Sequence, residues 1–126
     1  MTKYQNLYCK IYLNCDVSRD ELIQSIATIV NGKINVSSIL TPDCEIDVRK
    51  NEDFDENQCY EYPDGFLYYP YYLDIEPTEE IASIFYKQTI TRLLEAFWAE
   101  KSQAVAACDF EEELPRKGGY KWKLLS

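Results

Sequence analysis

The strongest constraint on the fold is a hydrophobic periodicity that switches between two residues and about 3.6 residues along the chain. Every second residue is apolar from Leu7 to Cys15, which is typical of a strand with one buried face. Extended patterns return over 34–48, with a break at Thr41-Pro42-Asp43, and over 66–76. Helical spacing over about 19–31 and 78–101, and small residues over 103–110, complete the series strand, helix, strand, strand, helix, strand.

Local signals mark the ends of both predicted helices. Ser18 with Glu21 three residues later forms a capping box, and Gly32 is a typical C-terminal stop. Thr78 is the expected N-cap of the second helix, because two acidic residues follow it at the positive end of the helix dipole.

The chain of 126 residues has the length of a single domain, residues 1–126. The series of elements predicts an α+β fold of the ferredoxin-like split βαβ type, in which an antiparallel sheet carries both helices on one face. Pro70 lies inside the predicted strand 66–76, which argues for an edge strand or a bulge there. The alternation assigns to the open face the residues Tyr8, Tyr12, Glu45, Asp47, Tyr68, Tyr72 and Asp74.

The charge is strongly acidic and unevenly placed. The net charge is −9, and residues 43–80 hold 13 acids against two bases, so this segment carries −11 and the remainder +2. Binding to nucleic acid or to an anionic membrane needs a basic footprint, so both are poor expectations here. Tyrosine is also abundant, with 11 residues, and is favoured at protein interfaces.

The sequence has few residues of the kinds that usually catalyse reactions or bind metal ions. Histidine is absent, which removes the usual general base and the commonest metal ligand. The five cysteines form no C-x-x-C pair and resemble reduced thiols of a cytoplasmic protein. The acidic loop 53–64 matches a calcium loop only in part, since Gln58 occupies the place of the required glycine. We therefore expect neither an enzyme nor a bound metal or cofactor.

The acidic, tyrosine-rich segment is the candidate binding surface for a basic protein partner. Tyrosines would form its desolvated centre and carboxylates its rim. The candidate residues are Asp43, Glu45, Asp47, Asp53, Asp55, Glu56, Tyr60, Glu61, Tyr62, Asp64, Tyr68, Tyr72 and Asp74.

Two stretches, Gly65–Pro77 and Ala106–Pro115 with Gly118-Gly119-Tyr120, are similar to segments of small bacterial proteins. With the short, acidic character of the chain, they resemble the immunity proteins of contact-dependent inhibition and related polymorphic toxin systems. The resemblance implies a protein that binds the toxin domain of a sister-cell effector, commonly a basic nuclease. It implies inhibition by covering the active site or a neighbouring surface.

Two other classes of function stay open from the residues alone. One is a homo-oligomeric adaptor whose exposed strand pairs with its own copy, so the protein could be a monomer or a homodimer. The other is a carboxylate-based enzyme or a metal-binding protein, which would gather two or more of the 22 acids in one cleft.

Overall fold

The alternating segments form one sheet. The computed structural model describes residues 7–61, 65–78 and 83–119. Its sheet is six-stranded, antiparallel at every pairing, and ordered β2-β3-β4-β5-β1-β6. The strands are β1 (Cys9–Asn14), β2 (Lys33–Asn35), β3 (Ser38–Leu40), β4 (Cys44–Lys50), β5 (Tyr71–Pro77) and β6 (Gln103–Cys108).

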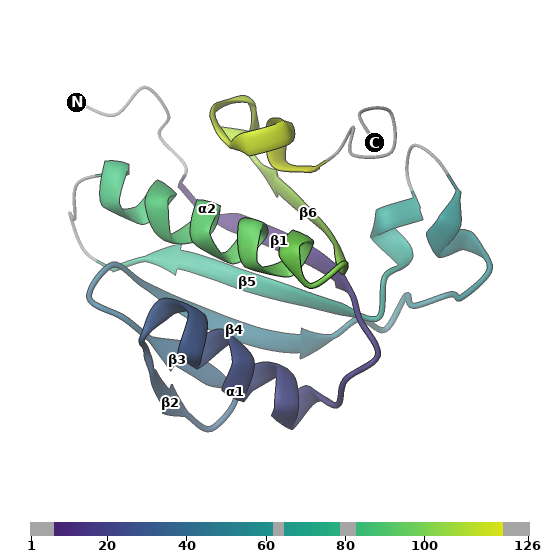
Figure 1. Cartoon of the computed structure of the whole chain (residues 1–126), viewed down its shortest axis with the longest axis horizontal. Helices are drawn as coiled ribbons and strands as arrows, with labels where there is room; N and C mark the ends of the chain where they lie inside the picture. Colours follow the sequence, from purple (N-terminus) through teal and green to yellow (C-terminus); the bar gives the residue numbers. More distant parts are fainter. Residues whose placement is uncertain (1–6, 62–64, 79–82, 120–126) are drawn as a thin grey trace.

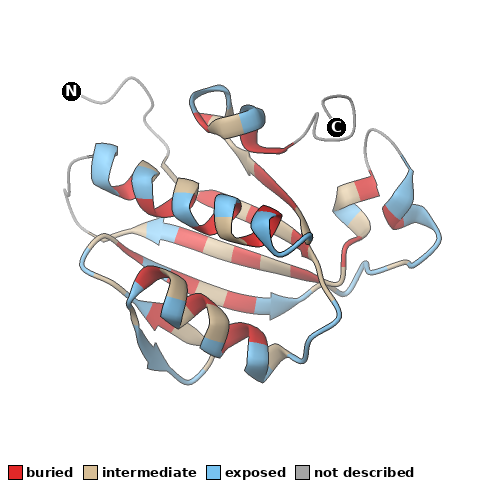
Figure 2. Cartoon of the chain, viewed as in Figure 1, coloured by how far each residue is buried: buried red, intermediate tan, exposed pale blue. Residues whose placement is uncertain are grey.

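Two helices, α1 (Arg19–Val30) and α2 (Ser83–Ala99), cover the same face of the sheet (Figure 1). The core lies between these helices and the sheet, where Ile11, Leu73 and Ile90 are completely buried. Buried positions alternate along β1, β4 and β5, so the face of these strands away from the helices carries the partly exposed residues (Figure 2). The predicted α+β class with an antiparallel sheet and two helices on one face is confirmed.

The ends of α1 follow the predicted signals. The backbone N–H of Glu21 donates to Ser18 Oγ at 3.2 Å, which caps the first turn. The helix ends at Val30, and Asn31 caps it with a left-handed φ of 54°. The predicted stop, Gly32, comes next and donates its N–H to the carbonyl of Ala27 at 2.9 Å. Residues 79–82, where the second helix was expected to begin, lie outside the described residues, and Thr78 Oγ1 donates to the carbonyl of Pro42.

The predicted four-stranded ferredoxin-like sheet is wrong in the number and order of its strands. Residues 33–40 form an extra hairpin, β2–β3, which extends the sheet beyond β4. Its turn is Val36-Ser37, and Val36 adopts a φ of 59°. A β-branched residue rarely takes this conformation, so the sequence carries no ordinary turn signal at this point.

The predicted strand over 66–76 is also corrected. Gly65–Tyr68 forms a short 3₁₀ helix, η2, and β5 begins only at Tyr71, directly after Pro70. β5 lies between β4 and β1, so it is a central strand rather than an edge strand. The segment between β4 and β5 also contains η1 (Gln58–Tyr60), and Figure 1 shows it at the end of the sheet where β4 ends and β5 begins.

β6 lies at one edge of the sheet, and the chain that follows it packs against it. A 3₁₀ turn, η3 (Glu111–Glu113), follows the strand, and then a tight turn, η4 (Pro115–Gly119), in which Arg116, Lys117 and Gly118 have positive φ. The Trp98 indole N–H donates to the carbonyl of Ala104 at 3.0 Å. Gly119 has a φ of 93°, and a Cβ atom there would lie 2.3 Å from the same carbonyl oxygen. Only glycine allows so close an approach, and the contact protects an otherwise available strand edge.

Candidate functional site

The face of the sheet away from the helices places like charges directly opposite one another. Glu45 in β4 pairs with Glu76 in β5, and Asp47 pairs with Asp74 two residues along. Opposed carboxylates on neighbouring strands repel, so this arrangement costs stability. We call these four residues the acidic strand pair. With Tyr8 they line a hollow of about 230 Å³.

Hydrogen bonds and one arginine hold the inner end of the acidic strand pair. Arg49 contacts Asp47 at 2.7 Å and Asp74 at 3.4 Å. Tyr8 donates its hydroxyl proton to Asp74, and burial together with this bond raises the pKa of Tyr8. The two outer carboxylates, Glu45 and Glu76, are both exposed. The outer pair is therefore the part of this cluster that can meet a partner.

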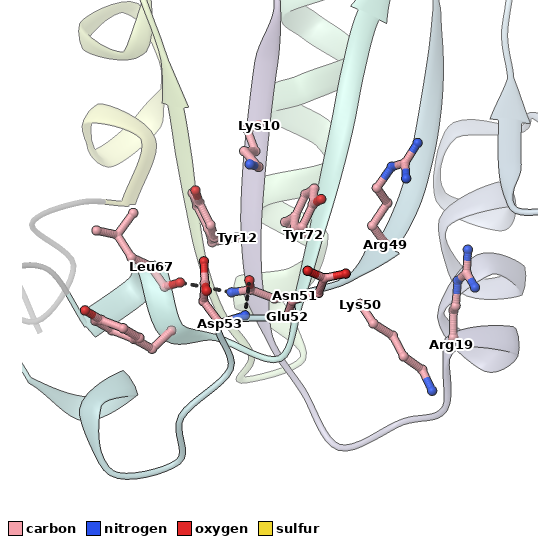
Figure 3. A pocket seen from close by; sticks show the side chains of 11 residues that line it. Lys10, Tyr12, Arg19, Arg49, Lys50, Asn51, Glu52, Asp53, Leu67 and Tyr72 are labelled. Atoms are coloured by element: carbon pink, nitrogen blue, oxygen red, sulfur yellow. Dashed lines mark hydrogen bonds between the residues drawn. The ribbon is translucent and has the colours of Figure 1, made fainter.

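The next row of the same face consists of aromatic and basic residues. Tyr12 in β1 pairs with Tyr72 in β5, which in turn pairs with Arg49 in β4. Lys10 places its ammonium group 4.1 Å from the centroid of the Tyr72 ring and 5.4 Å from that of Tyr12. Figure 3 shows Lys10 between these two rings. A cation over the face of an aromatic ring is attracted by the ring quadrupole.

This row opens into a hollow with a volume of about 680 Å³, which we call the basic hollow. Its four basic residues are Lys10, Arg19, Arg49 and Lys50, and Figure 3 places the last three on the far side of Tyr72 from Lys10. Two acids, Glu52 and Asp53, also line it. The hollow thus has an excess of two positive charges in a protein of net charge −9.

The segment between β4 and β5 forms one wall of the basic hollow, and the side chain of Asn51 connects its two ends. Asn51 Nδ2 donates to the carbonyls of Leu67 at 2.9 Å and Tyr69 at 2.7 Å, and Asn51 Oδ1 accepts from the N–H of Asp53 at 3.0 Å. Because these bonds connect both ends of the segment, they fix the position of Leu67 and Tyr68 in the wall.

A second apolar cluster anchors the same segment on the open face. Cys59, Tyr69 and Val105 are buried together, and the ring of Phe66 meets that of Tyr12 edge-on at 5.3 Å. Burial raises the pKa of Tyr69 to about 12. The alternation predicts that Tyr69 faces the helices with Tyr71, but Tyr69 lies on the opposite side of the sheet. The open face is therefore partly covered.

The predicted binding residues fall into separate places. Glu45, Asp47 and Asp74 lie together in the acidic strand pair, and Asp53, Tyr68 and Tyr72 line the basic hollow. Asp43 accepts a hydrogen bond from Thr89 of α2 at 3.0 Å, so it is directed toward the helix layer. Glu56, Tyr60 and Glu61 are exposed on the η1 segment, and Tyr62 and Asp64 lie outside the described residues.

The Asp55 carboxylate stabilises its own loop through hydrogen bonds. Its Oδ1 accepts from the N–H groups of Asn57 at 2.9 Å and Gln58 at 3.1 Å, and its Oδ2 accepts from Gln58 Nε2. These bonds hold the turn that leads into η1 and lower the pKa of Asp55. The carboxylate is thus occupied with its own loop, which argues against its use as a calcium ligand. Within the described ranges, no group of three or more Cys, Asp or Glu residues is arranged to hold a metal ion.

Sequence reasoning missed the residues that set the character of this face. Lys10 lies in the same alternation phase as Tyr8 and Tyr12, so its place on the open face could have been found. Arg19 could not, because it reaches the hollow from the first turn of α1, where its Nε donates to the carbonyl of Val48 at 3.1 Å. Glu76 continues the β5 alternation and was overlooked as the partner of Glu45.

Comparisons with known protein families, with curated proteins and with solved structures found no match. Among the described residues, neither helix is long and apolar enough to cross a membrane.

Proposed function

We propose that this chain is an immunity protein that binds and neutralises a bacterial toxin domain of basic charge, without catalysis of its own. The observation that carries the proposal is the acidic strand pair, in which Glu45 faces Glu76 and Asp47 faces Asp74 across neighbouring strands. Arg49 bridges the inner pair and Lys10 lies opposite Asp74, so the repulsion acts chiefly between Glu45 and Glu76. Repulsion of this kind lowers the stability of a sheet and persists where a function uses the charge. A basic surface placed over the outer pair would relieve it.

The expected interface extends from the acidic strand pair toward Tyr72. Opposite charges steer the encounter and raise the association rate, whereas buried aromatic contacts slow dissociation. The basic hollow beside Tyr72 has the reverse charge, so a partner that fits this face would present an acidic group next to its basic surface. A face with both signs fixes the orientation of the partner and excludes a uniformly basic one.

Binding to the toxin domain encoded immediately upstream is the direct test. Co-expression is expected to give a complex and to restore growth, and absence of both would overturn the immunity function. The surface is tested with Glu45→Gln plus Glu76→Gln, which remove two charges without touching Arg49. The association rate constant is expected to fall roughly three- to tenfold, with a weaker dependence on salt.

A matched control separates the surface from the total charge. Asp20→Asn plus Glu95→Gln removes the same two charges from exposed positions on the two helices. This variant is expected to associate at nearly the unaltered rate. If the two double variants behaved alike, the acidic strand pair would not be the binding surface, even if the complex itself forms.

A homo-oligomeric adaptor remains the second candidate because of the edge strand β2. All three of its residues are exposed, Ile34 among them, and Val36 in the adjoining turn is 90% exposed. Light scattering on the purified protein distinguishes the two functions. A dimer that Ile34→Lys converts to monomer would support the adaptor, and a monomer at all concentrations would exclude it.

A further inference from the structure

Two of the five cysteines lie directly opposite one another on neighbouring strands. Cys9 in β1 pairs with Cys108 in β6, and both are free thiols. Cys9 is completely buried in the core under the helices, and Cys108 is partly exposed and packs against the same core. They are 99 residues apart in the chain, so the pairing exists only in the folded protein.

The two thiols are also in contact and have different chemical characters. A hydrogen bond from the Cys9 thiol to Cys108 Sγ raises the pKa of Cys9, which burial raises further. The same bond lowers the pKa of Cys108, and the backbone N–H of Phe110 stabilises its thiolate as well. A partly exposed cysteine of lowered pKa beside a buried thiol of raised pKa is the arrangement of an attacking and a resolving cysteine.

The geometry of an antiparallel pair permits a bond between these two sulfur atoms. Directly opposed residues have Cα atoms about 4.5–5.5 Å apart, which lies within the range of about 4.4–6.8 Å that disulfides span. Two other cysteines, Cys44 and Cys59, are not placed for this. β5 lies between β4, which carries Cys44, and β1, and Cys59 is buried in the cluster on the other face of the sheet.

We propose that Cys9 and Cys108 form a peroxide-sensitive dithiol that closes to a disulfide within the folded protein. The Cys108 thiolate attacks one oxygen of hydrogen peroxide, and the O–O bond breaks. Hydroxide departs from the peroxide, and Cys108 becomes a sulfenic acid. The Cys9 sulfur then attacks the sulfenic sulfur, and the S–O bond breaks as the S–S bond forms. The two thiols lose two electrons and two protons, and the peroxide becomes two molecules of water.

Closure would tie β1 to the edge strand β6 and so to the segment that follows it. Phe110, two residues after Cys108, is completely buried and meets the ring of Tyr86 in α2 at 6.1 Å between centroids. The disulfide would therefore fix the edge of the sheet that lies farthest from β2. This inference is independent of the proposed partner.

The test is oxidation of the purified, folded protein with a small excess of hydrogen peroxide. The expected product has three free thiols instead of five, a mass lower by about 2 Da, and a peptide map that joins Cys9 to Cys108. Dithiothreitol should restore five thiols. Five unreacted thiols, a bond between another pair of cysteines, or sulfinic acid at Cys108 without a bond to Cys9 would each overturn the proposal.

Variants identify the role of each thiol. Cys9→Ser should leave Cys108 as a sulfenic acid that dimedone captures, and Cys108→Ser should abolish both products. Cys15→Ser is the matched control, because burial raises the pKa of Cys15, and it should form the disulfide as the unaltered protein does. The peptide map of the unaltered protein decides the case if a core variant fails to fold.

Discussion

The ammonium group of Lys10 lies over the ring of Tyr72, with Nζ 4.1 Å from the ring centroid. The contact joins neighbouring strands, because Lys10 belongs to β1 and Tyr72 to β5. On the open face, this contact lies at the boundary between the acidic strand pair and the basic hollow. One side chain thus contributes both to the sheet and to the charge pattern on its surface.

Lys10→Met should lower the free energy of unfolding by about 0.5–1 kcal/mol, because methionine retains the apolar stem and loses the cation over the ring. Urea unfolding measures the change. Lys33→Met, on the exposed edge strand β2, serves as the control and should change stability by less than about 0.5 kcal/mol. Equal losses in the two variants would show that the contact with Tyr72 contributes nothing.

Asn51→Ala should destabilise the segment between β4 and β5 by about 1–2 kcal/mol, because three hydrogen bonds depend on this side chain. Amide hydrogen exchange should quicken first at residues 52–69, before the core of the sheet is affected. Asn57→Ala lies in the same segment and forms none of these bonds, so its exchange should match that of the unaltered protein. Uniform quickening throughout the chain would argue against a local clamp.

Acid should weaken the structure around η1 through Asp55. The hydrogen bonds from Gln58 and Asn57 place the pKa of Asp55 below its ordinary value of 3.8 in the folded protein. The folded state therefore favours the charged carboxylate, and its contribution is present above pH 3.8 and disappears as the pH falls through the lowered pKa. An NMR titration of the Asp55 carboxyl carbon measures this value directly.

Asp55→Asn supplies the control for that titration. It should be less stable than the unaltered protein at neutral pH and should approach it in stability as the solution is acidified. Asp53→Asn removes a neighbouring charge without these hydrogen bonds and should not show this convergence. A titration of Asp55 at its ordinary pKa would contradict the structural task assigned to it.

Tyr86→Phe should cost about 1 kcal/mol, because the completely buried hydroxyl of Tyr86 donates to the carbonyl of Ile75 at 3.0 Å. The bond connects α2 to the central strand β5. Tyr72→Phe removes a hydroxyl from the partly exposed face and should change the free energy of unfolding by less than about 0.5 kcal/mol. Urea unfolding measures both changes. Equal losses of unfolding free energy in the two variants would show that the hydrogen bond from Tyr86 to Ile75 contributes nothing to stability.

Some features were predicted correctly because neighbouring residues determine them. The alternation around Ile11 places β1, and Ser18 with Glu21 places the start of α1, since a strand face and a helix cap depend on residues a few positions apart. The placement of Asp47 and Asp74 on the open face was also predicted, because each follows the alternation of its own strand, whereas their pairing was not.

Other features depended on contacts that a local pattern cannot express. The hairpin β2–β3 was missed because its turn places Val36 at a positive φ, which no sequence rule expects of valine. Tyr69 was assigned to the wrong face because the residues before Tyr71 form a 3₁₀ helix rather than an extended strand. Pro70 marked the break, but its consequence was decided by how Asn51 folds the segment back.

The sequence by itself determined the class of fold, the phase of β1, β4 and β5, and the acidic excess between residues 43 and 80, because these follow from composition and short-range spacing. Only the tertiary structure decided that Glu45 faces Glu76, that Arg19 reaches the hollow beside Tyr72, and that Cys9 meets Cys108. Register between distant strands arises from the packing of the whole core, and the chemistry of this protein's surface depends on that register.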